Sequence, residues 1–348
     1  MRQKKSTVSS SYRSSEKKDG TGGERRCPTS RLEENQHSIG VKTPLAIVGP
    51  TASGKTPLSI ELAKRLRGEV VSADSRQVYK HLTVGTSKPS DRDRAAIPHH
   101  FVDTLDPKEL YSAGLFAQQA STVVSEIISR RKLPLLVGGS GLYIRAVIDG
   151  LFEGPSADPG IRSRLERRLQ DVGVDGILAD LERVDSETAR TMKKEPKARR
   201  IIRALEVFHA TGIPLSAHIK SQPGKTRLSW IQVSLDWDRK ELYGRIDARA
   251  DSMVNGGLIE EVQWLNDHGY DQRLNALNTV GYKEVFDYLK GVHSLTACID
   301  LIKRNTRRFA KRQLTWFRAD KRIRWIQVRG EPDWSALAEM IVEKYERV

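Results

Sequence analysis

The residues with the clearest chemistry in this chain lie between Gly49 and Thr56. The stretch fits the phosphate-loop pattern G-x-x-x-x-G-K-[ST], and it consists of Gly49, Pro50, Thr51, Ala52, Ser53, Gly54, Lys55 and Thr56. In such a loop, backbone N–H groups surround phosphate oxygens at a helix N-terminus, where the helix dipole favours negative charge. Lys55 adds a positive charge and Thr56 adds a hydroxyl for Mg²⁺. The motif predicts a phosphate-binding site but does not say whose phosphates are bound.

The segments around this loop have the order of a strand, a loop and a helix. The apolar run 45–48 predicts a buried strand, and leucines at four-residue spacing from 58 to 66 predict one face of a helix. Two further apolar runs, 69–72 and 133–137, predict strands with helical patterns between them. This alternation implies a parallel sheet with right-handed crossovers.

The carboxyl ends of the predicted strands carry the remaining candidate residues. The second strand ends at Asp74, and the third runs into the glycine-rich stretch 138–143. In open parallel sheets, ligands collect at the carboxyl ends of the strands. We therefore expect the phosphate loop, Asp74 and residues 138–143 to form one site. Strand-like segments at 230–235 and 324–328 extend the predicted sheet.

The charge of the chain points to a polyanionic partner. The 348 residues carry a net charge of +15. Between Arg190 and Arg203 a dense basic cluster has only Glu195 opposing it, and a second basic run lies on 303–317. Each phosphate that a protein neutralises releases counterions, so such surfaces favour binding of a polyanion. A single charge run is also typical of a solvated helix face.

Changes in composition predict three parts of the chain. Residues 1–40 have almost no large apolar side chains and predict a disordered basic tail. This tail resembles a transit peptide only weakly, and a basic tail that adds affinity for nucleic acid is equally compatible. Strand patterns disappear over 151–220, which predicts a helical insertion. The fold class expected for 41–150 and 221–348 is α/β, a P-loop-type parallel sheet flanked by helices.

Other features limit the class of protein. Cys27 and Cys298 lie far apart and lack metal-ligand spacing, so neither a disulfide framework nor a zinc site is expected. No stretch approaches the roughly 18 apolar residues that span a bilayer. We therefore expect a cytoplasmic protein without a membrane partner, and a monomer. A phosphate loop alone is most typical of nucleotide triphosphatases and kinases, and the position of Asp74 leaves a small-molecule kinase open.

The motifs as a set are collinear with a known family over residues 43 to about 330, and the chain resembles the tRNA dimethylallyltransferase (isopentenyltransferase) family. The matching stretches are Gly49–Thr56, Ser72–Tyr79, Val84–Pro89, Ile97–Asp103, Tyr111–Ala113, Leu135–Tyr143, Arg203–Val207, Val280–Lys283 and Lys311–Trp316. No Cys and His pattern supports the C-terminal zinc finger of the eukaryotic members, which favours a bacterial or organellar type.

The resemblance implies transfer of a dimethylallyl group from dimethylallyl diphosphate to N6 of adenosine 37 in the anticodon loop of tRNA. The loop Gly49–Thr56 would then hold the pyrophosphate leaving group together with Mg²⁺. By similarity, Thr51, Lys55 and Thr56 contact the diphosphate, and Thr56 contacts the metal. Arg249 looks like the family's distal diphosphate-binding arginine. Asp74 would act as general base by accepting the proton of the attacking amine.

The family's tRNA contacts map onto three stretches and two single residues of this chain, and the resemblance implies that the basic segment 151–220 binds the anticodon arm. The implied tRNA-binding residues are Asp74, Ser75, Arg76, Gln77, Ser140, Arg162, Arg199, Arg200, Ile201, Ile202, Arg203, Asn278, Thr279, Val280, Gly281, Tyr282 and Lys283. Ser140 departs from the more common threonine but keeps the hydroxyl. Residues 195–197 depart from the family's usual Pro-Asn-Asp turn.

Two rival functions remain open beside the leading one. One is prenylation of free AMP or ATP, which the basic insertion disfavours because a mononucleotide needs no such surface. The other is a small-molecule kinase. Among the aromatic residues, Tyr143, Trp230 and Trp316 are expected in the core rather than in base stacking, and the pair at 99–100 is expected to pack in a loop rather than to bind a metal.

Overall fold

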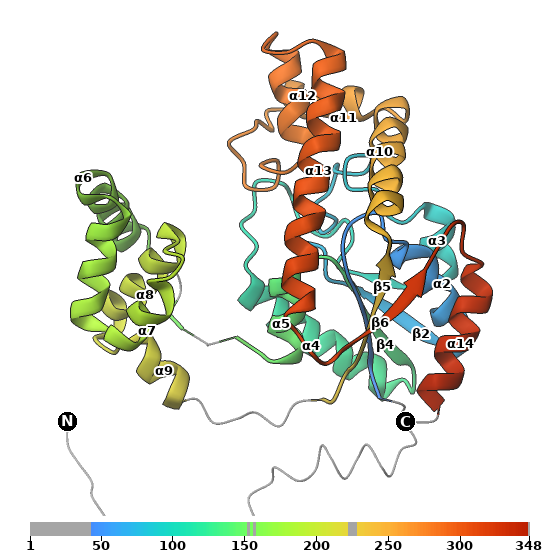
Figure 1. The fold of residues 1–348 in the computed structure, drawn as a ribbon, viewed down its shortest axis with the longest axis horizontal. Helices are drawn as coiled ribbons and strands as arrows, with labels where there is room; N and C mark the ends of the chain where they lie inside the picture. The colour runs from blue at the N-terminus through green and yellow to red at the C-terminus, as the bar shows by residue number, and fades with distance from the viewer. Residues whose placement is uncertain (1–42, 152–153, 156–157, 222–227, 347–348) are drawn as a thin grey trace, which may run out of the picture. The chain divides into compact units, whose positions relative to one another are not determined.

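A six-stranded parallel sheet organises the part of the chain that the computed structural model describes, residues 43–151, 154–155, 158–221 and 228–346. Its spatial order is β3-β2-β4-β1-β5-β6 (Figure 1). The strands are β1 (Leu45–Val48), β2 (Gly68–Ser72), β3 (His99–His100), β4 (Leu133–Gly138), β5 (Ile231–Trp237) and β6 (Ile323–Val328). The predicted α/β class is confirmed. The predicted disordered tail, 1–40, lies outside the described residues.

The edge strand β3 differs from the expectation of a loop. It spans two residues, and its backbone pairs His99 with Val70 and His100 with Val71. Such a short strand carries no periodic pattern, so only the pairing with its neighbour defines it.

Alternate residues of each strand enter two apolar clusters on opposite faces of the sheet. In β1, Ala46 and Val48 belong to one cluster, while Leu45 and Ile47 belong to the other, and all four are 0% exposed. A strand that is covered on both faces must be apolar at every position, which explains the continuous run in the sequence.

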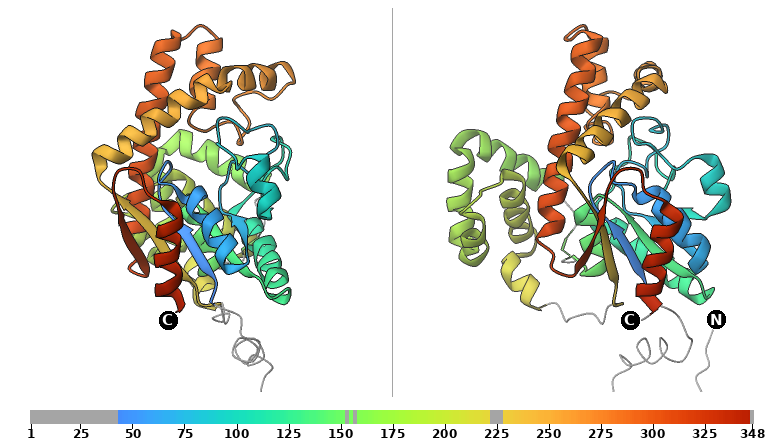
Figure 2. Two further views of the ribbon diagram at one scale, coloured as in Figure 1. Left: turned by 90° about the vertical axis from the view of Figure 1, so that its right-hand side faces the viewer. Right: turned by 45° about the vertical axis from the view of Figure 1, so that its right-hand side comes forward.

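Helices cover both faces and continue past the carboxyl ends of the strands. The first cluster includes residues of α4 (Ala113–Ser129) and α5 (Gly141–Ile148). The second includes residues of α2 (Lys55–Leu66) and α14 (Trp334–Glu346). Figure 2 shows the long helices α10 (Arg239–Asn255) and α13 (Leu295–Arg318) rising beyond the sheet with α11 (Leu258–Asp267) and α12 (Tyr282–Leu289). A short α3 (Asp91–Ala96) precedes β3. No helix in the described ranges is long and apolar enough to cross a membrane.

A separate apolar cluster joins the helices between β4 and β5. The helices of this cluster follow α5 in the chain and are α6 (Pro159–Val184), α7 (Ser186–Met192), α8 (Ala198–Thr211) and α9 (Leu215–Ser221). Leu165, Ile177, Leu181 and Ile201 are among its buried members. These elements occupy the segment in which the sequence lacks strand patterns. That this segment is a distinct domain stays a prediction.

Glu69, in β2, is a buried carboxylate that the sequence gives no reason to single out. It is 3% exposed. Its oxygens lie 2.8 Å from His100 Nε2, 2.8 Å from Arg130 Nη2 and 2.9 Å from Lys132 Nζ. Burial by itself raises the pKa of Glu69, but hydrogen bonds from His100, Lys132 and Arg130 outweigh it and lower the pKa to about 2.

Replacing this carboxylate is expected to destabilise the fold in a pH-dependent way. Glu69→Gln should lower the free energy of unfolding at pH 7 by about 1–3 kcal/mol, because three donors lose a charged acceptor. Since the pKa of Glu69 falls from 4.5 to about 2 on folding, the stabilisation is complete above pH 4.5 and is lost as the pH falls toward 2. Urea titrations from pH 7 to pH 3 should therefore show a shrinking difference from wild type. Glu126→Gln, at an exposed position of α4, is the control. Equal stability of Glu69→Gln and wild type at pH 7 would contradict this account.

Candidate active site

The phosphate loop connects β1 to the N-terminus of α2. Gly49, Ala52 and Gly54 have positive φ angles of 139°, 61° and 93°, which turn the backbone sharply between strand and helix. Helix α2 begins at Lys55, and the Leu58 N–H donates to the Gly54 carbonyl at 3.2 Å. The loop therefore presents the free N–H groups and the positive dipole end of a helix, as an anion requires.

Side chains from β5 and α10 hold the loop from outside. Trp237 Nε1 donates to the Ser53 carbonyl at 2.9 Å, and Arg245 Nε donates to the Ala52 carbonyl at 3.0 Å. The Arg245 guanidinium also lies 4.4 Å from the centroid of the indole ring of Trp237. These contacts fix the loop before any ligand binds.

Lys55 lies at the end of the loop in a half-buried position near the positive charge of Arg249. Its Nζ donates to the Pro50 carbonyl at 2.6 Å. Burial, and secondly the charge of Arg249, lower the pKa of Lys55 to about 7, while the charge of Asp74 acts in the opposite direction. An anion bound at the loop would favour the protonated lysine and raise this pKa.

Arg249, on α10, lies on the same side of the site. Its Nη2 donates to the Thr86 carbonyl at 3.3 Å. Burial lowers the pKa of Arg249, and the Asp74 carboxylate raises it. Asp74 thus acts electrostatically on both Lys55 and Arg249, so the segment after β2 lies near the start of α2 and near α10.

Asp74 lies two residues after the end of β2 and is half-buried. Its Oδ1 accepts the Arg76 N–H at 2.8 Å and the Gln77 N–H at 3.4 Å. Among the described residues, Oδ2 has no hydrogen-bond partner. The carboxylate is therefore oriented by its own loop through one oxygen, while the other oxygen is available to a substrate.

The loop 83–87 is held by polar side chains that sequence patterns do not identify. Gln77 Nε2 donates to the carbonyls of Thr86 and Ser87, each at 3.2 Å. The Glu261 carboxylate accepts the Thr83 and Val84 N–H groups at 2.9 and 2.7 Å. The only sequence signal for these roles would be a contact between distant positions, which a single sequence does not carry.

Helix α13 lies directly against the turn that follows β4. Gln313 Oε1 accepts the Thr51 N–H at 2.9 Å, and Gln313 Nε2 donates to the Gly139 carbonyl at 2.9 Å. A Cβ at Gly139 would lie 2.4 Å from Gln313 Nε2, and one at Gly141 would lie 2.3 Å from Trp316 Nε1. A Cβ at either position would displace a side chain of α13, so Gly139 and Gly141 let this helix lie close to the turn.

Ser140 connects the same turn to the Asp74 loop. Its Oγ accepts the Ser75 N–H at 3.0 Å and lies 3.3 Å from Ser75 Oγ. Arg76 Nη1 donates to the Asn275 carbonyl at 2.5 Å, so this loop is also tied to the segment before α12. The predicted residues 74–77 and Ser140 are therefore neighbours in space.

The implied tRNA-binding residues on α8 divide into exposed and buried side chains. Arg199 and Arg200 are exposed, whereas Ile201 and Ile202 are 0% and 6% exposed within the apolar cluster of α6 to α8. Their burial leaves the isoleucines a packing role and limits side-chain contact with a ligand to the arginines.

Two other implied residues, Arg162 and Arg203, converge on the buried Glu206. Arg162 Nη2 lies 3.2 Å and Arg203 Nη1 lies 2.8 Å from Glu206 Oε2. The carboxylate accepts a hydrogen bond from each guanidinium and so fixes its orientation. Both side chains remain partly exposed, at 41% and 36%.

The stretch 278–283 also contains both exposed and buried side chains. Asn278 and Lys283 are exposed, and Tyr282 is 0% exposed. The Tyr282 hydroxyl donates to Glu261 Oε1 at 2.6 Å, and its ring closes on Gly85, where a Cβ would lie 2.5 Å from the ring. Tyr282 therefore supports the loop 83–87 from within.

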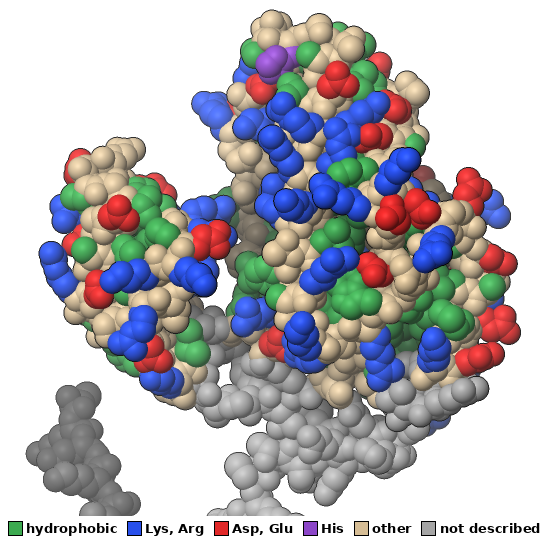
Figure 3. Space-filling view, viewed as in Figure 1, with side chains coloured by type: hydrophobic (Ala, Val, Ile, Leu, Met, Phe, Trp, Pro, Cys, Tyr) green, Lys and Arg blue, Asp and Glu red, His purple; other side chains and the backbone are tan. Residues whose placement is uncertain are grey.

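Basic side chains gather over α13 on the face shown in Figure 3. Arg304, Arg308, Lys311 and Arg312 are exposed along this helix. The run 303–317 thus forms a positive surface on the helix that contacts the phosphate loop through Gln313.

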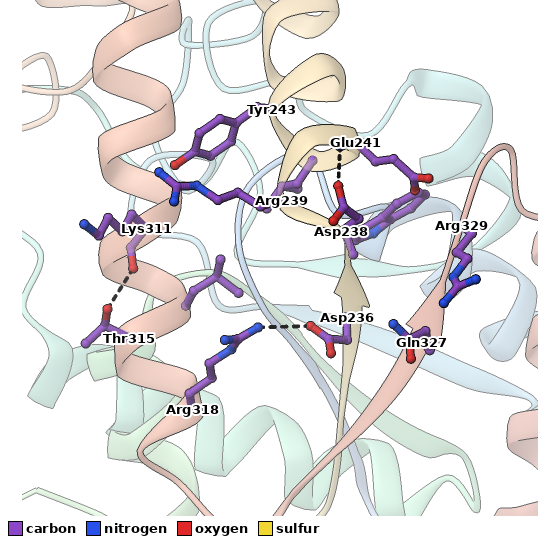
Figure 4. A pocket seen from close by; sticks show the side chains of 13 residues that line it. Asp236, Asp238, Arg239, Glu241, Tyr243, Lys311, Thr315, Arg318, Gln327 and Arg329 are labelled. Carbon is purple, nitrogen blue, oxygen red and sulfur yellow. Dashed lines mark hydrogen bonds and ion pairs between the residues drawn. The ribbon is translucent and has the colours of Figure 1, made fainter.

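A pocket of about 740 Å³ lies beside this helix, at the carboxyl ends of β5 and β6 (Figure 4). Its lining comes from β5, the start of α10, α13 and the end of β6, and includes Trp237 and Lys311. Arg318 Nη2 lies 3.2 Å from Asp236 Oδ1 across it. Trp237 joins this pocket to the phosphate loop, but the loop itself does not line it.

A phosphate loop follows β1 of the parallel sheet, and the Asp74 carboxylate lies just after β2. This combination is typical of phosphate-loop enzymes of the α/β class. The IPP transferase family model matches residues 77–320. A tRNA dimethylallyltransferase 1 from Pelobacter propionicus is 44% identical over 284 residues, which cover 81% of this chain and 92% of the relative. A tRNA dimethylallyltransferase from Pelotomaculum thermopropionicum is 40% identical over 305 residues, 87% of this chain and 96% of the relative.

Solved structures agree with these relatives. The full-length tRNA isopentenylpyrophosphate transferase from Bacillus halodurans aligns with a TM-score of 0.64 and 39% identity, covering 88% of this chain and 97% of that one. A eukaryotic dimethylallyltransferase acting on tRNA aligns with a TM-score of 0.75 and 26% identity, covering 86% and 77%. The chain belongs to the IPP transferase family of tRNA dimethylallyltransferases, as its motifs predict.

Proposed function

We propose that the chain transfers a dimethylallyl group from dimethylallyl diphosphate to N6 of adenosine 37 in the anticodon loop of tRNA. The observation that carries this proposal is the position of Asp74, which acts electrostatically on both Lys55 and Arg249 beside the phosphate loop. This position would set a proton acceptor beside the leaving group, as transfer of an allylic group to an amine requires.

The phosphate loop would bind and neutralise the departing pyrophosphate. An allylic C–O bond breaks readily once negative charge on the leaving group is stabilised, and the loop N–H groups, Lys55 and Arg249 provide that stabilisation. Gln313 and Arg245 keep the loop backbone in place through Thr51 and Ala52. These residues form the diphosphate side of the proposed site.

The residues at the loop fit a magnesium ion that is shared with the substrate. Mg²⁺ usually keeps several waters and binds through one or two protein ligands plus substrate phosphates. Thr56, at the start of α2, would supply the hydroxyl. Among the described residues, no group of three or more His, Cys, Asp or Glu forms a metal site by itself. The ion would neutralise charge on the diphosphate.

Asp74 would take the proton of the attacking amine. The exocyclic amine of adenine is a poor nucleophile because its lone pair is delocalised into the ring. A carboxylate at the amine accepts its proton as attack proceeds, a role that typically contributes about 10²–10⁴-fold. The adenosine would be flipped out of the anticodon loop to reach Asp74, at a cost of a few kcal/mol.

Transfer to tRNA rather than to a mononucleotide is supported by the basic surfaces. The exposed Arg199 and Arg200 on α8 and the positive face of α13 exceed what a mononucleotide needs. The segment 151–220 would grip the anticodon arm. A cytoplasmic monomer that uses tRNA and dimethylallyl diphosphate is the form in which we expect the enzyme to act.

A comparison of acceptors tests this proposal. The enzyme is incubated with Mg²⁺, labelled dimethylallyl diphosphate and, in parallel, unmodified tRNA, AMP or ATP. Label is expected in tRNA alone. Label in AMP or ATP but not in tRNA would favour the adenylate-prenylating alternative and overturn the proposal.

Affinity for tRNA is expected to fall steeply with salt. The logarithm of the association constant should decrease linearly with the logarithm of salt concentration, because bound lysines and arginines displace counterions. The double variant Arg199→Ala/Arg200→Ala should bind more weakly and have a slope smaller by about 1 for each lost phosphate contact. Filter binding at several salt concentrations measures both quantities. Lys344→Ala, at an exposed position of α14, is the control. A salt-independent affinity would refute the electrostatic argument.

A further inference from the structure

The sequence pattern predicts that Trp316 lies in the core, and this prediction is wrong. Its side chain is 44% exposed, although it belongs to an amphipathic helix with a buried face. Spacing explains the error: Ala310, Gln313 and Phe317 form the buried face, and Trp316 lies on its border. An exposed tryptophan at the edge of a candidate site needs an explanation other than core packing.

The indole of Trp316 rests on the turn that leads to the proposed acceptor site. A Cβ at Gly141 would lie 2.3 Å from Trp316 Nε1, so the ring directly covers this glycine. The preceding residue, Ser140, accepts the Ser75 N–H at 3.0 Å, and Ser75 follows Asp74. A short series of contacts therefore connects the ring to the carboxylate that would receive the amine proton.

A second aromatic ring and a guanidinium continue this surface along α13. Phe309, Arg312 and Trp316 are spaced by three and four residues, which places them on one side of the helix. Phe309 is 39% exposed, and the Arg312 guanidinium lies 5.7 Å from the centroid of its ring. We call Phe309, Arg312 and Trp316 the aromatic stripe of α13.

The composition of the aromatic stripe fits a single-stranded nucleic acid. Aromatic rings stack on unpaired bases, and an interleaved arginine pairs with the phosphate backbone. A lipid surface or an apolar protein segment would be a poor match, since Arg304, Arg308 and Lys311 are also exposed on the same helix. The bases of an anticodon loop are unpaired, and flipping one adenosine removes a stacking partner from its neighbours.

We propose that Trp316 stacks on a base of the anticodon loop that flanks the target adenosine, with Arg312 and Phe309 continuing the contact along the loop. The inference rests on the proposed function, because it assigns a role within the same tRNA site. The ring would replace the stacking that the flanking base loses when the adenosine turns toward Asp74.

Substitution of Trp316 should weaken tRNA binding without affecting the donor. Trp316→Leu is expected to raise the dissociation constant for an anticodon stem-loop by about 5- to 100-fold, because an aromatic stack is lost. Trp316→Phe should retain most of the affinity, since it keeps a ring. Dimethylallyl diphosphate should bind equally well to all variants. Trp264→Leu, which removes a 40% exposed tryptophan of α11, is the matched control.

An abasic substitution in the RNA provides the decisive measurement. Stem-loops that lack the base on either side of the target adenosine are titrated against wild type and Trp316→Leu. At one of these positions, removal of the base should weaken binding of the RNA to the wild-type protein by the same factor as Trp316→Leu weakens binding of the intact RNA. Removal of the same base should have little further effect on binding to Trp316→Leu. Equal losses in both proteins at both positions would overturn the stacking contact. If wild type modifies no tRNA at all, the proposed function fails instead, so the two outcomes are distinguishable.

Discussion

Asp74→Asn is expected to keep its affinity for tRNA and to lose about 10²–10⁴-fold in turnover, because an amide cannot accept the proton of the attacking amine. The asparagine oxygen can still accept the Arg76 N–H that Asp74 Oδ1 accepts at 2.8 Å, so the loop should keep its conformation. Single-turnover rates at saturating tRNA and dimethylallyl diphosphate measure the chemical step. Filter binding measures the affinity.

Two comparisons make this expectation specific to the base role. Asp91→Asn, at the exposed start of α3, should leave both quantities unchanged. Ser140→Ala should weaken the support of the Ser75 backbone and reduce the rate less than loss of the carboxylate does. A wild-type rate in Asp74→Asn would remove Asp74 from proton transfer and leave it the role of orienting its own loop.

Dimethylallyl diphosphate is expected to bind with proton uptake above pH 7. Burial, and secondly Arg249, lower the pKa of Lys55 to about 7, so the lysine is protonated below pH 7 and loses its proton above it. A bound diphosphate stabilises the protonated form and raises this pKa. Above pH 7, binding must therefore restore the proton, and the contribution of Lys55 to affinity falls by up to about tenfold per pH unit.

Calorimetric titration at pH 8 in two buffers of different ionisation enthalpy measures this proton uptake. Lys55→Arg is the informative control because arginine stays charged across the range, so its binding should lack the lysine's proton uptake. Lys55→Ala should bind the donor at least about 100-fold more weakly, since a charge-assisted contact to phosphate is lost. Identical proton uptake in wild type and Lys55→Arg would contradict the assignment of the titration to Lys55.

Local sequence was enough to predict most of the fold. Strands covered on both faces must be apolar throughout, so runs such as 45–48 and 133–137 identify the parallel sheet directly. The phosphate loop and Asp74 were predicted because each lies just after such a strand. The edge strand β3 was not predicted, because two residues cannot display a period.

The rest of the site depends on contacts between distant positions. Gln313 binds Thr51 across 262 positions of the chain, and Glu261 binds Val84 across 177. Neither glutamine nor glutamate has a local pattern that reveals such a partner. The prediction for Trp316 was wrong for a related reason. A large aromatic residue on an amphipathic helix most often lies in the core, and only the packed structure shows that Trp316 lies outside the buried face of α13.

We propose that the phosphate loop holds the diphosphate of a prenyl donor while Asp74 receives the proton of an adenosine amine. The most direct test is a single turnover with unmodified tRNA, dimethylallyl diphosphate and Mg²⁺, followed by digestion of the tRNA to nucleosides and mass spectrometry. We predict N6-dimethylallyl adenosine at position 37, with one pyrophosphate released for each modified nucleoside. Hydrolysis of ATP or transfer of its phosphate, with no prenylated nucleoside in the tRNA, would contradict the claim and assign the loop to a kinase.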